Sequence, residues 1–230
     1  MRVAVITPYY REDFRTLWRC HRSVLKQDYQ LHRHFLVSDG HPLSYINNWN
    51  CEHLKLPNCG DYGDTPRAVA AAVACAQDYD AVAFLDADCW WDHTHLERCV
   101  ATLQESKADV VTIPRKLFTP DAKFLQIDAE SDGEAFNDTN CFLVSRNAYV
   151  FISAWMWKLK HLSKIGDRIF WAALKQNGVK IARAPVATVN YTTNIAFHYQ
   201  QAGLTPPPDS RVIVNDNGIF RDKRWADVQG

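Results

Sequence analysis

Ala81-Val82-Ala83-Phe84-Leu85-Asp86-Ala87-Asp88 joins an apolar run to two closely spaced acids. The apolar run is typical of a buried strand whose two faces are both covered. Because side chains alternate along an extended segment, Asp86 and Asp88 should point the same way. Carboxylates are hard oxygen ligands that suit Mg²⁺ or Mn²⁺, and such an ion can neutralise a diphosphate. The stretch therefore predicts a buried strand that ends either at a metal site or at a solvated loop that carries two acids.

Further apolar and amphipathic segments alternate on both sides of this strand. They predict strands at 3–6, 34–38, 109–113 and 141–145, and helices at 13–27, 65–77, 93–105, 148–162 and 167–177. Alternating strands and helices are the pattern of an α/β sheet with helices on its faces. Ligands of such sheets bind at the carboxyl ends of the strands. Thr7, Asp39 and Asp86 each follow a predicted strand, so we expect them near a binding site.

The remaining segments carry weaker patterns. Residues 43–64 and 114–140 are polar and are expected to be irregular. Segments 179–183 and 186–191 are expected to pair with each other as strands. Residues 203–230 contain Pro206-Pro207-Pro208 and are expected to form an extended C-terminal tail on the surface.

The composition narrows the classes of function. The 230 residues suit one domain, and 26 basic side chains balance 26 acidic ones, which argues against a nucleic-acid partner. The apolar start at residues 1–6 is too short for a secretory signal, and no apolar run approaches a transmembrane segment. The seven cysteines include no Cys-x-x-Cys pair, which favours reduced thiols in a cytoplasmic protein.

Three further residues have both a structural and a functional interpretation. Asp167 is placed to cap a helix, or to act as a general base toward a hydroxyl group. His198 lies between two aromatic residues, where it could pack in the core or bind a metal. Arg67 opens a helix and could be a surface residue or could reach a phosphate group. The residues alone leave each choice open.

Taken together, the motifs resemble the family 2 type of GT-A fold glycosyltransferases. The resemblance spans about residues 3–200 and depends on the order of the motifs more than on any one of them. The matching segments are the opening strand and loop Ile6–Glu12, the helix end Ser23–Tyr29, the Asp-Gly turn Val37–Gly40, the Gly-x-x-x-Arg segment Gly63–Arg67, the Asp-x-Asp motif Leu85–Asp88, the acceptor-side strand Asp138–Phe142 and the base region Gly166–Asp167.

The resemblance implies a fold and a reaction. The fold is the GT-A (Rossmann-like) mixed sheet flanked by helices, in a single domain over 1–202 with a nucleotide-sugar half at 1–115 and an acceptor half at 116–202. The reaction is a metal-dependent, inverting transfer from a nucleoside diphosphate sugar to a glycan or another hydroxyl acceptor. A UDP-sugar is favoured over a GDP-sugar, and Mn²⁺ or Mg²⁺ is the expected cofactor.

The resemblance also implies roles for individual residues. Asp167 would be the general base, acting alone because its region reads Gly-Asp-Arg without a second acid. Asp138 and Asn140 would lie on the acceptor side. The metal would be held by Asp86, Asp88 and His198. The nucleotide-sugar contacts would be Thr7, Pro8, Tyr10, Arg11, Asp39, Arg67, Asp86, Ala87 and Asp88.

Alternative functions are weighed against this one. A sugar nucleotidyltransferase would carry a glycine-rich first loop, whereas Thr7–Arg11 contains no glycine. A dinucleotide oxidoreductase would need Gly-x-Gly-x-x-Gly after the first strand, and that motif is absent. A protein that binds a nucleotide sugar or a glycan without turnover stays open, although Asp86, Asp88 and Asp167 together favour catalysis.

Overall fold

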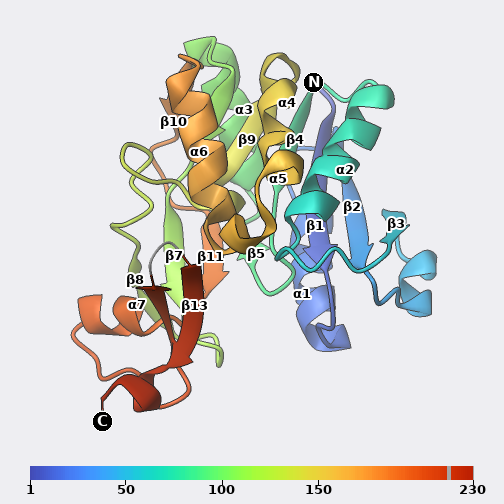
Figure 1. Ribbon diagram of the computed structural model, residues 1–230. Coiled ribbons are helices and arrows are strands. Elements are labelled where there is room, and N and C mark those ends of the chain that lie inside the picture. The colour runs from blue at the N-terminus through green and yellow to red at the C-terminus, as the bar shows by residue number, and fades with distance from the viewer. Residues whose placement is uncertain (217–218, 230) are drawn as a thin grey trace.

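A seven-stranded sheet forms the centre of the protein in a computed structural model, which describes residues 1–216 and 219–229 (Figure 1). Its strand order is β10-β6-β9-β4-β1-β2-β3. The strands are β1 (Val3–Tyr9), β2 (His32–Asp39), β3 (Glu52–Leu56), β4 (Ala81–Phe84), β6 (Val110–Thr112), β9 (Phe142–Ser145) and β10 (Ile181–Arg183). Helices flank this sheet, so the predicted α/β class is confirmed.

Strand direction decides where the polar strand ends meet. β1 pairs in parallel with β2 and β4, and Ile6 lies beside both Phe35 and Phe84. The carboxyl ends of these three strands therefore lie side by side, with Asp39 at the end of β2 and the acidic stretch just after β4. β9 runs antiparallel between β4 and β6, which makes the sheet mixed.

Two groups of helices cover the two faces of the sheet. One face packs against α2 (Asp64–Ala76), α4 (Tyr149–Ile152), α5 (Ala154–Trp157) and α6 (Gly166–Gln176), and the other against α1 (Phe14–Leu25) and α3 (His95–Ser106) (Figure 1). Alternation along β1 supplies both cores, because Ala4 and Ile6 face the first group while Val3 and Val5 face the second. This burial of apolar side chains is the main force that holds the layers together.

A smaller sheet of order β5-β11-β7-β8 lies beside the central one. Its strands are β5 (Trp90–Trp91), β7 (Arg115–Phe118), β8 (Phe124–Ile127) and β11 (Val189–Thr192). The predicted pairing of 179–183 with 186–191 is wrong, because β10 pairs with β6 while β11 pairs with β5 and β7. The link between them contains Pro185 and lacks the Asn-Gly type of turn that a tight hairpin favours.

Local predictions fail in three other segments. Residues 148–162 form α4, α5 and part of a 3₁₀ helix, because the backbone turns extended at Lys158, whose ammonium group reaches Asp64 at 3.0 Å. Residues 43–64 contain a 3₁₀ helix at Ser44–Asn48 and the edge strand β3. Residues 114–140 contain β7 and β8. The polar composition of both segments concealed strands that are only partly buried.

The C-terminal segment folds into a hairpin where an extended tail was expected. After α7 (Ala196–Gln201), strand β12 (Arg211–Asp216) pairs antiparallel with β13 (Ile219–Arg224), and a 3₁₀ turn follows at Trp225–Val228. The run Val212-Ile213-Val214 has the β-branched composition that favours a strand. Residues 217, 218 and 230 of the expected tail lie outside the described residues. Within 1–216 and 219–229, no helix has the length and apolarity needed to cross a membrane.

Candidate functional site

Two adjoining cavities open where the parallel strands end. The strand-end cavity has a volume of about 630 Å³ and is lined mainly by residues at or just after the carboxyl ends of β1, β2 and β4 and by the loop between β3 and α2. The α6 cavity has a volume of about 720 Å³ and lies between the start of α6, α7 and the C-terminal hairpin. Four residues line both cavities, namely Tyr62, Arg67, Asp86 and Arg211. The two cavities therefore form one continuous candidate site.

The strand-end cavity collects most of the residues predicted from the sequence. Its walls include Pro8, Tyr10, Asp39, Arg67, Asp86, Ala87 and Asp88. Asp39 is almost fully buried and accepts a 2.6 Å hydrogen bond from the Cys59 backbone N–H, which fixes its carboxylate at the cavity edge. The parallel pairing of β1 with β2 and β4 brings the carboxyl ends of these strands to one edge of the sheet, where the cavity lies.

Asp86 is held rigidly at the junction of the two cavities. One carboxylate oxygen pairs with the Arg67 guanidinium, and the other accepts a hydrogen bond of 2.8 Å from the Asn140 amide. The Asp86 backbone N–H donates in return to the Asn140 side-chain oxygen. Asn140, predicted on the acceptor side, is fully buried and lines neither cavity, and its two contacts position Asp86.

Arg67 links this junction to the start of α2. Its guanidinium is almost fully buried and pairs with Asp64 at 3.2 Å as well as with Asp86. The preceding Gly63 has φ +83°, and a Cβ there would lie 2.8 Å from the Pro8 side chain. Only glycine allows this left-handed backbone to pass so close to Pro8. The loop therefore brings Arg67 against the wall of the strand-end cavity.

Asp88 differs from Asp86 because it forms no ion pair among the described residues. Its side chain is open to the cavity, and the nearest polar contact is the Cys89 thiol at 3.3 Å. Desolvation by the surrounding protein raises the pKa of Asp88 to about 6, and the neighbouring Asp86 carboxylate adds to this shift. A cation or a hydrogen-bond donor bound in the cavity would relieve that repulsion.

His198 does not join the two acids. Its ring is buried in the wall of the α6 cavity, with Nδ1 2.7 Å from the Thr193 hydroxyl and Nε2 3.7 Å from Glu130. Across residues 1–216 and 219–229, no three His, Cys, Asp or Glu side chains lie close enough together to hold a metal ion. The expected set of Asp86, Asp88 and His198 is therefore not assembled by the protein alone.

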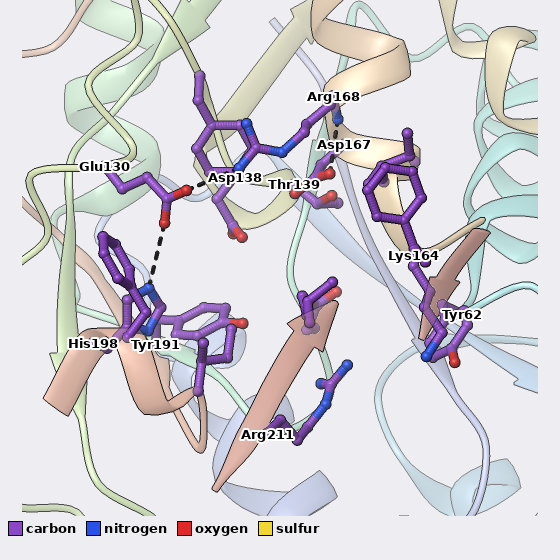
Figure 2. Close-up of a pocket in the computed structure, with 18 of the residues that line it drawn as sticks. Tyr62, Glu130, Asp138, Thr139, Lys164, Asp167, Arg168, Tyr191, His198 and Arg211 are labelled. Atoms are coloured by element: carbon purple, nitrogen blue, oxygen red, sulfur yellow. Dashed lines mark hydrogen bonds and ion pairs between the residues drawn. The ribbon is translucent and has the colours of Figure 1, made fainter. Parts of the chain in front are cut away.

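The α6 cavity contains the predicted base, Asp167, in the first turn of α6 (Figure 2). The side chain of Asp167 is partly exposed and accepts a 2.7 Å hydrogen bond from the Arg168 backbone N–H. Burial raises the pKa of this carboxyl to about 7, and the charge of Asp138 raises it further. A carboxyl group that exchanges its proton near neutral pH is suited to general base catalysis.

The start of α6 is fixed by contacts that tolerate only glycine at position 166. A Cβ on Gly166 would lie 2.1 Å from a carboxylate oxygen of Asp64, so no side chain fits there. The buried Trp155 indole donates a 2.9 Å hydrogen bond to the Gly166 carbonyl, which holds the same turn from the core side. The network that includes Arg67 therefore also sets the position of Asp167.

Arg115 is a buried residue of the site that sequence reasoning missed. Its guanidinium pairs with Asp128 at 2.6 Å and with Asp138, and it lies 4.1 Å above the Tyr191 ring. Asp138, predicted on the acceptor side, does line the α6 cavity, and Arg115 holds its carboxylate there. The position of Arg115 just after the strand at 109–113 was the signal that could have drawn attention to it.

Two predicted contacts lie outside the cavities. Thr7 is fully buried, and its hydroxyl lies 2.9 Å from Nε2 of His34, because alternation along β1 turns it into the core. Arg11 is exposed, donates to His41 at 3.2 Å, and lines neither cavity. Glu130 and Arg211 line the α6 cavity instead, and no local sequence pattern marks either of them.

Comparisons with known proteins agree with this architecture. The sequence profile described as glycosyl transferase family 2 matches residues 4–130. No curated protein sequence matches the chain significantly. The crystal structure of S. aureus TarS 1-349 is similar with a TM-score of 0.65 and 18% identity over 84% of this chain and 60% of that one. The structure of the same TarS segment in complex with UDP-GlcNAc has a TM-score of 0.66 and 19% identity over 84% and 59%.

These matches establish the fold and show how much of the known structures the chain covers. The likeness to TarS confirms the expected arrangement of a mixed sheet flanked by helices. At 18–19% identity the likeness shows a shared fold. The chain spans 60% of the shorter TarS chain and 38% of the longer one, so it corresponds to only part of those proteins.

Proposed function

The chain belongs to glycosyl transferase family 2, and from that premise we propose that it transfers a sugar from a nucleoside diphosphate sugar to an acceptor hydroxyl. One observation carries the proposal. Asp88 in the strand-end cavity and Asp167 in the α6 cavity face a continuous site, with Asp86 and Arg67 at the junction. This arrangement provides one cavity for a donor and one for an acceptor, and the reaction centre would lie between them.

The donor nucleotide occupies the strand-end cavity in this proposal. Asp39 contacts the base, Asp86 contacts the ribose, and the diphosphate lies beside Asp88. The sugar then reaches the junction, where Arg67 and Tyr62 line both cavities. A UDP-sugar is favoured over a GDP-sugar, which the UDP-GlcNAc complex of the similarly folded TarS supports. The acceptor is a glycan or another molecule that carries a hydroxyl group.

The residues of the strand-end cavity fit Mg²⁺ or Mn²⁺ bound together with the donor. The Asp88 carboxylate has no cationic partner in the described structure, and Asp86 supports it from the junction. Mg²⁺ usually binds through one or two carboxylates plus substrate phosphates, so it does not need a complete set of protein ligands. When bound, the ion would stabilise the diphosphate as a leaving group. We leave His198 out of this set.

Asp167 is the general base in the proposed reaction. Its carboxylate takes the proton from the acceptor hydroxyl while the hydroxyl oxygen forms a bond to the anomeric carbon of the donor. The bond from that carbon to the diphosphate breaks, and the nucleoside diphosphate leaves with the electron pair. In this proposal the hydroxyl attacks from the α6 cavity on the side of the anomeric carbon away from the diphosphate, so the anomeric configuration inverts. We also place the protein in the cytoplasm, where its seven free cysteines stay as thiols.

The pH dependence of turnover tests this proposal. With Mn²⁺ present, release of UDP or GDP from a nucleotide-sugar panel should show kcat/KM rising through a pKa near 7, the value to which burial raises Asp167. Below that pKa the protonated carboxyl cannot accept a proton, so the rate should fall about tenfold for each pH unit. A kcat/KM that stays constant from pH 5 to 8 would contradict the role of Asp167.

The control for this profile is the same assay with a metal chelator. The chelator should abolish release of the nucleoside diphosphate at every pH, since no metal ion then neutralises the charge of the diphosphate leaving group. Failure of every UDP- and GDP-sugar to turn over, with intact nucleotide binding, would favour a binding protein without catalysis. Formation of a nucleotide sugar from a nucleoside triphosphate and a sugar phosphate would favour a nucleotidyltransferase.

A further inference from the structure

Arg211 is the residue of the C-terminal hairpin that reaches both cavities. It opens β12, more than a hundred residues along the chain from the acidic stretch after β4. In Figure 2, Asp138 and Asp167 line one side of the α6 cavity and Arg211 lies on the other. The family profile ends at residue 130, so it does not cover this segment.

The strand-end cavity is lined by more acidic than basic side chains, so an anionic ligand needs a cation there. Its charged lining consists of Glu12, Asp39, Asp86, Asp88, Arg67 and Arg211. Arg67 is only 6% exposed and is already neutralised by Asp64 and Asp86. Among the described lining residues, Arg211 is therefore the cationic side chain that is accessible to an anionic ligand, because 38% of its side-chain surface is exposed.

The hairpin holds Arg211 in place by contacts on both its backbone and its side chain. The Arg211 backbone N–H donates to the Asn194 carbonyl at 2.7 Å, next to a bridge between Arg211 and Ile195. The guanidinium donates to Asp222 across the hairpin at 3.1 Å, and Asp222 also pairs with Lys164 in the segment before α6. A guanidinium has five N–H donors, so this bond leaves others for a ligand.

We propose that Arg211 binds the diphosphate of the donor, which makes the C-terminal hairpin part of the donor site. The inference rests on the proposed function, because it takes a nucleoside diphosphate as the ligand. A guanidinium matches two phosphate oxygens at once and keeps its charge at any physiological pH. Asp222 is a positioning residue that turns the guanidinium toward the junction and joins the hairpin to the segment just before α6, the helix that carries Asp167.

The test compares a nucleoside diphosphate with the nucleoside that lacks its phosphates. Arg211→Ala should weaken UDP binding about 10- to 100-fold in a calorimetric titration with Mn²⁺, the range for loss of a charged hydrogen bond. Binding of uridine, followed by NMR, should not change. Arg211→Lys should weaken UDP binding by less, since it keeps a charge but not the bidentate geometry. GDP and guanosine replace this pair if the wild-type protein binds GDP instead.

Arg221→Ala is the matched control, because it removes the same charge from the same hairpin at a residue that lines neither cavity. It should leave UDP affinity unchanged. Equal UDP affinity in Arg211→Ala and the wild type would overturn the inference while leaving the proposed function intact. An equal loss of uridine and UDP binding in both Arg211 variants would also overturn it, because the effect would then be structural. A wild-type protein that binds neither UDP nor GDP would overturn the proposed function itself.

Discussion

Asp167→Asn is expected to lower kcat about 10²- to 10⁴-fold, the usual contribution of a general base, while UDP still binds with wild-type affinity. The amide has the size of the carboxyl group and can still accept the 2.7 Å hydrogen bond from the Arg168 backbone N–H. It cannot take a proton from an acceptor hydroxyl. The change therefore removes the proposed chemistry and leaves the first turn of α6 in place.

The measurement is steady-state release of the nucleoside diphosphate, together with a binding titration. Asp167 lines the α6 cavity and not the strand-end cavity, so a loss of kcat should leave nucleotide affinity alone. Glu134→Gln is the matched control, because Glu134 is exposed and lines neither cavity. A kcat in Asp167→Asn equal to that of the control would remove Asp167 from the mechanism.

Arg115→Ala is expected to destabilise the folded protein by about 3–5 kcal/mol, the cost of breaking a buried ion pair from one side. The substitution would leave the buried carboxylates of Asp128 and Asp138 without the guanidinium that now pairs with both. Urea unfolding at pH 7 should show the loss.

Lys123→Ala provides the comparison for an exposed pair. Lys123 and Asp121 are 2.9 Å apart, yet both are largely exposed, and such pairs contribute little to stability. A loss in Arg115→Ala no larger than in this control would show that Asp128 and Asp138 do not depend on Arg115. Neutralising both acids in the Arg115→Ala background should recover part of the stability, since the uncompensated charges are then gone.

The features that were predictable from the sequence depend on short stretches of chain. The apolar run at 81–85 predicts β4, and the strand patterns predict that Asp39 and Asp86 lie at strand ends, which the sheet places on either side of β1. Asp167 was found because a helix start is visible from local residues. In each of these cases the backbone conformation follows from burial and from the nearest few residues.

The rest of the site depends on contacts between distant segments. Asn140 resembled an acceptor-side residue but positions Asp86, because β9 inserts beside β4 in the sheet. His198 pairs locally with Thr193 and does not reach the acids. Arg211 reaches the junction only because residues expected to form a loose tail fold into a hairpin. The spacing of residues along the chain does not predict these contacts.

The most direct test of the central claim is a calorimetric titration of UDP and GDP into the wild-type protein and Asp88→Asn, with and without Mn²⁺. The claim is that a nucleoside diphosphate and its metal bind beside Asp88 in the strand-end cavity. We expect one nucleotide to bind the wild type only with Mn²⁺, and its affinity to fall about tenfold or more in Asp88→Asn, since the amide removes a charged oxygen ligand. Binding that is equal in both proteins and indifferent to Mn²⁺, or no binding at all, would contradict the account.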